Sequence, residues 1–321
     1  MNINMKEFQN YKSSNNNKIL FVLPLDKIEE NILSECIYSL SEQEQDVDLL
    51  ILNSGLDEPS IKNLIGMLES PSVIRSVLKS EPNPNKEQET IKKTGKNKIN
   101  FIIEETKCVS FNSLFNESFN YANINNYEWF TVFEYDDLFL QNWLKYFNFY
   151  STHRSEFDVF LPLVREMTHG GFAGFLNEAS WVDGFSEVAG VFDLNLLLRF
   201  NCLNITGSAF KVKSIKNYSE EIDGIYKPMK ESIKINYSYE FVLRMIYNDL
   251  KFYTIPRLGY DHKINNVVDK VSYFKSKLPL DITQKSIDNG GVSIEEYKFW
   301  MDLSKKEYFF DNDRKKSYQT T

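Results

Sequence analysis

The sequence is short of cysteine, which limits the chemistry that can hold the chain together. Only three cysteines occur among its 321 residues, at Cys36, Cys108 and Cys202. Their number is odd and their spacing matches no metal-binding motif, so neither a disulfide framework nor a cysteine metal site is expected. We predict reduced thiols and a cytoplasmic location.

Long hydrophobic runs are also missing. A membrane-spanning helix needs about 18 apolar residues in succession. The longest candidates here are residues 19–25 and a segment around 188–198, which Asp193 interrupts. Residues 1–17 are polar and contain no apolar core of a secretory signal, so they are predicted to be a disordered lead-in. We therefore expect no transmembrane segment.

A surplus of basic residues is missing as well. Lysine and arginine number 37 against 45 aspartate and glutamate, which gives a net charge of −8 at pH 7. This balance argues against a nucleic-acid partner, and any anionic ligand would need a local cation from a metal, Lys or Arg. Hydrophobic residues make up 42% of the chain, enough for one large or two small packed domains.

Three acidic residues follow a hydrophobic run in the middle of the chain. Residues 129–133 have the length and the aromatic and β-branched content of a buried strand, and Glu134, Asp136 and Asp137 come directly after it. Clustered carboxylates repel one another unless a cation lies between them, and oxygen ligands suit Mg²⁺ or Mn²⁺. Alternatively, Asp136 or Asp137 caps a helix in residues 138–150.

The first part of the chain indicates a β-α-β unit. Residues 19–25 form a continuous apolar run, which is typical of a parallel strand buried on both faces. Apolar residues at helical spacing follow in 29–42, and a second apolar run, 47–52, ends in the turn signal Asn53-Ser54-Gly55. The pattern predicts an α/β domain.

Further elements follow at intervals typical of an α/β protein. We predict helices at 59–68, 111–122, near 141–150 and at 239–250, and strands at 100–103, 157–164, 204–212 and 252–255, the last ending at Pro256. Residues 80–98 are predicted to be an exposed, mobile insertion, and the glycine-rich residues 168–178 a flexible substrate loop or a plain connection.

Two stretches carry a resemblance to a known family. Residues 133–137, Phe-Glu-Tyr-Asp-Asp, match an L-D-x-D-D motif with Glu134 in place of the leading Asp. Residues 51–57 match V-V-D-D-G-S-x-D, with Asn53 and Ser54 replacing the two leading acids. In this order the stretches resemble the GT-A nucleotide-sugar glycosyltransferases, particularly the family 2-like group.

The second half of the chain extends the resemblance. Residues 237–244 match E-D-x-[DE]-x-x-x-R, of which Glu240 and Arg244 remain. A family tail, K-x-x-x-I-P-x-x-x-Y-x-H, is met by Lys251, Ile255, Pro256, Tyr260 and His262, and a family asparagine is echoed by Asn116.

The resemblance implies a GT-A fold, a Rossmann-like and mainly parallel mixed sheet flanked by helices, over residues 18–265. Residues 266–321 would be a short helical C-terminal extension with a polar tail. The implied activity is transfer of a sugar from a UDP-, GDP- or dTDP-sugar to a hydroxyl acceptor, with inversion and with Mn²⁺ or Mg²⁺ on the diphosphate. The acceptor would be a glycan, a lipid-linked sugar or a protein.

The resemblance also implies roles for individual residues. Asp136 is the chief metal residue, with Asp137 and His262 as further candidates. Nucleotide-sugar contacts are expected from Pro24, Leu25, Asn53, Ser54, Asp57, Asn116, Glu134 and Tyr135. Glu240 is the candidate base and Asp183 the alternative.

Each main assignment has an open alternative. Asn53 forms an ordinary turn instead of contacting the base, and Glu240 forms a routine i,i+4 salt bridge with Arg244. For the whole protein, the replaced acids leave room for a catalytically degenerate GT-A domain that binds rather than catalyses. A nucleotidyltransferase is less favoured, because such enzymes need a glycine-rich basic loop where this chain has residues 24–27, Pro-Leu-Asp-Lys.

Overall fold

The computed structural model describes residues 18–78, 88–168, 171–177, 203–233 and 237–263. Its elements are β1 (Ile19–Leu25), α2 (Glu30–Ser41), β2 (Val47–Asn53), α3 (Glu58–Glu69), β3 (Ser72–Leu78), β4 (Gln88–Thr94), β5 (Ile99–Glu105), α4 (Phe111–Ile124), β6 (Trp129–Val132), β7 (Leu138–Phe139), α5 (Trp143–His153), β8 (Val159–Thr168), β9 (Gly171–Leu176), β10 (Ala209–Lys211), α8 (Val212–Asn217), β11 (Glu220–Ile222), β12 (Ile225–Lys227), α9 (Tyr237–Tyr247) and β13 (Phe252–Lys263).

A nine-stranded mixed sheet forms the centre of the described part of the protein. Its order is β5-β2-β1-β6-β10-β8-β13-β7, and β9 pairs with β8. The first four strands are mutually parallel, as are β8 and β13, whereas β10, β7 and β9 run antiparallel to their neighbours. The predicted α/β class and mainly parallel mixed sheet are confirmed.

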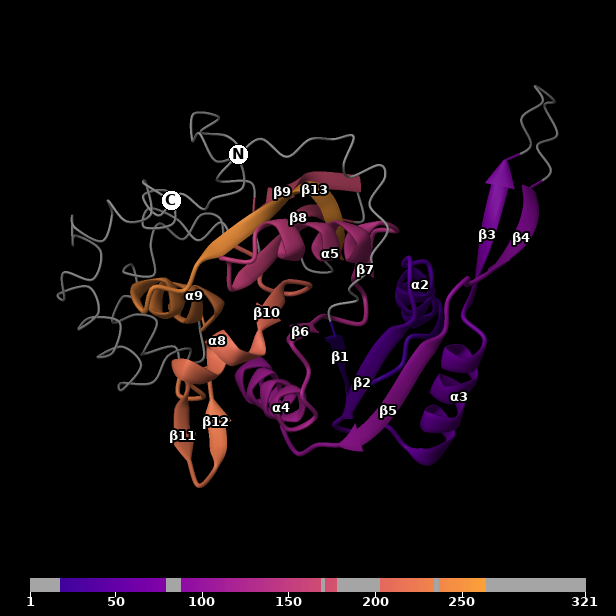
Figure 1. The fold of residues 1–321 in the computed structure, drawn as a ribbon. Helices are drawn as coiled ribbons and strands as arrows, with labels where there is room; N and C mark the ends of the chain where they lie inside the picture. The colour runs from indigo at the N-terminus through magenta and orange to yellow at the C-terminus, as the bar shows by residue number, and fades with distance from the viewer. Residues whose placement is uncertain (1–17, 79–87, 169–170, 178–202, 234–236, 264–321) are drawn as a thin grey trace, which may run out of the picture.

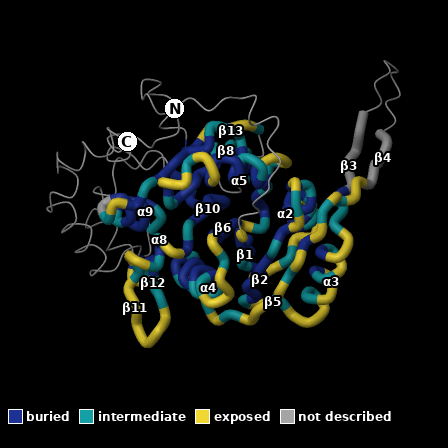
Figure 2. Tube along the Cα trace, in the orientation of Figure 1, coloured by how far each residue is buried: buried dark blue, intermediate teal, exposed yellow. Residues whose placement is uncertain are grey.

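Alternating side chains divide the core into two layers. On β1, Leu20 and Val22 pack with α4, α8 and α9, whereas Ile19, Phe21 and Leu23 pack with α2, α3 and α5. The pattern follows from strand geometry, in which successive side chains point to opposite faces. Figure 1 shows the helices on the two sides of the sheet, and Figure 2 shows the buried strands between them.

Two predicted strands end at different residues in the structure. The segment predicted as a strand at 204–212 is a strand only at β10, because Thr206 and Gly207 form a turn and Val212 begins α8. The strand predicted to end at Pro256 continues to Lys263, because a register shift after Ile255 accommodates the proline without a regular ladder bond.

The predicted connection and insertion also contain strands. Gly171–Leu176 of the glycine-rich stretch form β9, which pairs with β8. In the predicted insertion, Gln88–Thr94 form β4, which pairs with β3 in a separate hairpin. Residues 1–17, 79–87 and the predicted C-terminal extension lie outside the described residues. None of the helices in the described ranges has the length and apolar character needed to cross a membrane.

Candidate active site

The ends of three parallel strands bring the predicted site residues of the first half together. β1 pairs with β2 on one side and β6 on the other, with Leu25 opposite Asn53 in the register. Because these strands are parallel, their carboxyl ends share one edge of the sheet, where α/β proteins usually bind ligands. The acidic loop, Glu134 to Asp137, follows β6 at this edge.

Asp137 anchors the acidic loop to the end of β13. Its carboxylate is completely buried and accepts hydrogen bonds from the hydroxyl of Tyr260 at 2.7 Å and from the backbone nitrogen of Lys263 at 2.9 Å. Nδ1 of His262 lies 2.9 Å from each carboxylate oxygen. The helix-cap interpretation of Asp136 and Asp137 is wrong, because residues 138–139 form β7 and α5 begins only at Trp143.

Glu134, Asp137 and His262 form a group that could hold a metal ion. One ligand atom from each residue lies within 4.8 Å of the others, and Glu134 is exposed whereas the other two are buried. Two carboxylates and one imidazole suit Mn²⁺ well and offer Mg²⁺ its preferred oxygen ligands. The donor set therefore fits the divalent cation that the sequence predicts. Asp136 lies outside this group, so its leading metal role stays a prediction.

The negative charge of this region affects two buried neighbours. Burial, and then the charge and hydrogen bond of Asp137, raise the pKa of Tyr260 well above its usual value, so its hydroxyl stays a neutral donor. Burial and the charges of Asp137 and Asp136 likewise raise the pKa of Cys36 well above its usual range. Cys36 is therefore a buried core thiol of low reactivity.

Tyr135 connects the acidic loop to the loop after β1. Its hydroxyl donates to Glu29 at 2.9 Å, and Lys27 contacts the same carboxylate oxygen at 2.9 Å. The hydrogen bond from Lys27, followed by that from Tyr135, lowers the pKa of Glu29. Lys27 and Glu29 thus form an ion pair at this edge, in which the two charges offset each other.

Asn53 forms a turn, which the sequence allowed as the alternative to a nucleobase contact. Its side chain is buried, with Oδ1 accepting from the backbone nitrogens of Gly55 and Leu56 and Nδ2 donating to Glu105 at 2.6 Å. A nucleobase contact would have to displace these partners, and it stays a prediction.

The other residues expected at the end of β1 and β2 have local roles in this structure. Ser54 donates to the carbonyl of Leu25, whose own side chain is buried in the core beside the partly exposed Pro24. Asp57 caps α3 by accepting from the backbone nitrogen of Ser60 at 3.0 Å, and hydrogen bonds from the side chain and then the backbone of Ser60 lower its pKa. Their nucleotide contacts also stay predictions.

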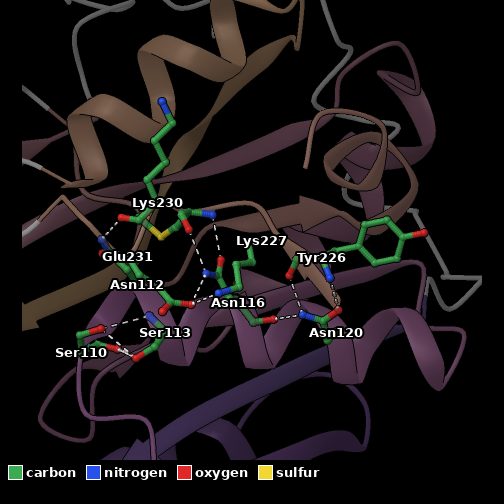
Figure 3. Close-up of polar contacts among 10 residues, drawn as sticks. Ser110, Asn112, Ser113, Asn116, Asn120, Tyr226, Lys227, Lys230 and Glu231 are labelled. Carbon is green, nitrogen blue, oxygen red and sulfur yellow. Dashed lines mark hydrogen bonds and ion pairs between the residues drawn. The ribbon is translucent and has the colours of Figure 1, made fainter. Parts of the chain in front are cut away.

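Asn116 belongs to a different structure, which we call the asparagine ladder and which consists of Asn112, Asn116 and Asn120. The three residues lie at i, i+4 and i+8 on α4 and therefore share one helix face. Their amides bond to main-chain atoms within residues 226–233. Figure 3 shows the three asparagines beside Tyr226 and Lys230 of this segment. Asn116 pairs with both the nitrogen and the oxygen of Met229, at 2.8 and 2.9 Å.

Glu240 also contacts the segment of residues 226–233, through Lys230 and through Arg244. It is only 3% exposed, and its carboxylate is bound by Arg244 at 2.7 Å, with Lys230 at 3.8 Å. Arg244 also donates to the carbonyl of Pro228 at 2.7 Å. The i,i+4 salt bridge is thus present, although it is buried rather than exposed. Asp183, the alternative base, lies outside the described residues.

The residues to which the site side chains bond could not be read from the sequence. The ladder is visible as a threefold Phe-Asn repeat in residues 111–120. The repeat gives the helix face of the asparagines but not the segment they bind. The bond from Tyr135 to Glu29 has no signal in the sequence, because 106 residues separate the two.

Solved structures of S. aureus TarS match this fold. TarS 1-349 in complex with UDP-GlcNAc is 12% identical with a TM-score of 0.53, covering 95% of this chain and 76% of that one. The complex with UDP is 10% identical with a TM-score of 0.53, covering 94% and 90%.

The chain has the GT-A fold. It aligns with a further TarS 1-349 structure at 13% identity and a TM-score of 0.52 over 77% of its own length, and it spans only 60% of that structure. The sequence matches no protein-family model, and no curated protein matches it either. In the GT-A fold seen here, the acidic loop and the end of β13 meet at the carboxyl edge of the sheet.

Proposed function

We propose that the protein transfers a sugar from a nucleotide-sugar donor to a hydroxyl acceptor, with Mn²⁺ or Mg²⁺ on the donor diphosphate. The observation that carries the proposal is the acidic loop at the carboxyl edge of a GT-A sheet, with Asp137, Glu134 and His262 grouped within reach of one cation. The TarS structures with the same fold were solved with UDP and UDP-GlcNAc, which favours a uridine nucleotide sugar as the first donor to test.

Residues of the acidic loop and of β13 would bind the donor together. Glu134, Asp137 and His262 would hold the metal, with Asp136 as the further predicted ligand, and Asp137 keeps the imidazole oriented through its hydrogen bond. The metal would supply Lewis-acid stabilisation of the departing diphosphate. Lys27 pairs with Glu29 at the same edge, and Tyr135 holds the loop through a hydrogen bond to the same carboxylate.

An inverting displacement also needs a base for the acceptor hydroxyl. Glu240 and Asp183 are the two candidates from the sequence. Because Arg244 and Lys230 both neutralise Glu240 in this structure, a structural role suits Glu240 better, and Asp183 becomes the first residue to test.

Donor binding tests the proposal directly. We expect UDP-, GDP- or dTDP-sugars with Mn²⁺ to raise the melting temperature, since a ligand at about 100 times its Kd stabilises a protein by about 2.7 kcal/mol. Asp136→Asn should abolish the metal-dependent part of this shift; because Asp136 is buried, the shift is measured against the melting temperature of the same variant without ligand. Asp26→Asn, an exposed acid at the same edge, serves as a control that should keep the full shift. A protein that no nucleotide sugar stabilises, with or without metal, would contradict the proposal.

A catalytically degenerate GT-A domain is the second candidate. The engagement of Asn53 and Asn116 within the fold favours it, because both residues replace or echo family positions expected to contact the donor. Release of free sugar or transfer from a bound donor would exclude it, whereas donor binding without either product would establish it.

A further inference from the structure

Tyr260 contacts the candidate metal group without belonging to it. Its side chain is completely buried, and its hydroxyl donates to Oδ2 of Asp137 at 2.7 Å. Asp137 has two further donors among the described residues, Nδ1 of His262 and the backbone nitrogen of Lys263. Because His262 is itself a member of the group, Tyr260 is the one side-chain donor in the described ranges that holds Asp137 from outside it. The hydroxyl therefore orients the carboxylate rather than adding a ligand.

A glycine leaves the space that the ring of Tyr260 needs. Gly207 has a φ of +74°, in the left-handed region that favours glycine, and a Cβ at this position would lie 2.5 Å from Cδ2 of the ring. The ring therefore packs directly against the backbone of residue 207. The nitrogen of Gly207 donates to the carbonyl of Val132, the last residue of β6, at 2.9 Å. The ring is thus fixed relative to the strand that leads into the acidic loop.

The ring also contacts the strand that follows the acidic loop. Tyr260 lies opposite Phe139 of β7 in the antiparallel register, and their ring centroids are 5.0 Å apart with an interplanar angle of 67°. Aromatic rings at this separation and angle attract each other edge to face. Tyr260 is therefore packed against both ends of the acidic loop, and it lies on the strand that also carries His262.

This position connects the two elements from which the metal group is built. Glu134 and Asp137 come from the acidic loop and His262 from β13, and one ligand atom of each lies within 4.8 Å of the others. Residues of two elements keep such a spacing only when packing and hydrogen bonds fix the elements to each other. The hydroxyl of Tyr260 supplies a hydrogen bond of this kind, because its ring is packed on both sides.

We propose that Tyr260 is a positioning residue for the metal group, and that its hydroxyl holds the carboxylate of Asp137 in the orientation in which it binds a divalent cation together with Glu134 and His262. The inference rests on the proposed function, since it requires a cation at this group. Residues that hydrogen-bond to a metal ligand typically change metal affinity by about 10- to 100-fold. One hydroxyl that is not itself a ligand should therefore have a measurable effect on metal binding.

Tyr260→Phe tests the proposal, because it removes the hydroxyl and keeps the ring. Calorimetric titration of the full chain with Mn²⁺ alone should show a dissociation constant raised about tenfold or more. The matched control is Tyr253→Phe, which removes the hydroxyl of another buried tyrosine, whose ring packs on Phe157 near the other end of β13. The control should leave the constant unchanged. An unchanged constant in Tyr260→Phe, or an equal rise in the control, would overturn the proposal.

A second substitution tests the same contact from the side of the glycine. Gly207→Ala displaces the ring and should also weaken Mn²⁺ binding, whereas Gly224→Ala should not, because Gly224 has a φ of +80° but no atom within 4 Å of an added Cβ. In the Tyr260→Phe background, Gly207→Ala should raise the dissociation constant no further, since the hydroxyl through which it acts is gone. Losses that add in the double variant would mean that the glycine and the hydroxyl act separately, which contradicts the proposal.

The outcomes separate this inference from the proposed function. A parent protein that binds no Mn²⁺ would contradict the metal of the proposed function and the role of Tyr260 together. A parent protein that binds Mn²⁺ with the same dissociation constant as Tyr260→Phe would overturn the positioning role alone, and the proposed donor site would stand. Urea denaturation checks that Tyr260→Phe and Tyr253→Phe are both folded under the conditions of the titration.

Discussion

Asp137 and Glu240 are both buried carboxylates, but the protein satisfies them differently. Asp137 accepts from a tyrosine hydroxyl, a backbone nitrogen and an imidazole, beside the acidic Glu134. Glu240 faces two cations, Arg244 and Lys230. A carboxylate with its own cations is neutralised within the fold, whereas one held mainly by neutral donors beside another acid still attracts a cation. The comparison favours the surroundings of Asp137 over those of Glu240 as the first place to test for chemistry.

Removing Asp137 should have the largest effect on both stability and ligand binding. Asp137→Ala leaves the hydroxyl of Tyr260 and the nitrogen of Lys263 without their acceptor, and it detaches the acidic loop from β13. We expect a loss of about 3 kcal/mol or more in the free energy of unfolding, measured by urea denaturation at pH 7.

The matched control is the exposed acid of the same group. Glu134→Gln should change the free energy of unfolding by no more than about 0.5 kcal/mol while weakening Mn²⁺ binding, which calorimetry measures. A cost below about 1 kcal/mol for Asp137→Ala would mean that the loop is held elsewhere.

Replacing Glu240 should lower stability but hardly change turnover. Glu240→Gln keeps an acceptor for Arg244 but leaves two cations without a counter-charge, so we expect a loss of about 2 kcal/mol in the free energy of unfolding and a transfer rate within a few-fold of the parent. Loss of a general base would instead lower the transfer rate about 100- to 10,000-fold.

Lys230 provides the control for this substitution. Lys230→Ala removes the longer and more exposed contact of the two, so its cost should be no more than about 1 kcal/mol. Should Glu240→Gln abolish transfer while donor affinity persists, Glu240 is the base and its salt bridge with Arg244 must open during the reaction.

Much of the fold was predictable because its signals are local. The continuous apolar runs of β1 and β2, the helical spacing between them and the acids after β6 each lie within a few residues of sequence. Their shared edge then follows from parallel strand order. The GT-A fold could therefore be predicted from the order of these segments, even where individual motif residues are replaced.

The partners of the site residues were not predictable in the same way. Pro256 indicated a strand end, and only the register shift beside β8 shows that the strand continues to carry Tyr260 and His262 to Asp137. Asn116 matched a donor-binding position, and its donor contact stays a prediction, but nothing in the sequence indicates that its amide bonds to both main-chain atoms of Met229. Both observations depend on contacts between residues far apart in the chain, which sequence spacing does not record.

The asparagine ladder tests whether Asn116 stabilises the fold or contacts the donor. Asn116→Ala removes the two hydrogen bonds to Met229 and a longer one to Glu231, and it leaves the nitrogen and the carbonyl of Met229 without their partner, so we expect a loss of about 2 kcal/mol in the free energy of unfolding. Asn125→Ala is the matched control, because that amide lies exposed at the end of the same helix and should cost less than about 0.5 kcal/mol. If Asn116 is scaffold, nucleotide-sugar affinity in the folded variant equals that of the parent. If Asn116 contacts the donor, as the family resemblance implies, affinity falls about tenfold while stability changes little. Calorimetric titration and urea denaturation of the same two variants separate these outcomes, because the two interpretations predict changes in different quantities.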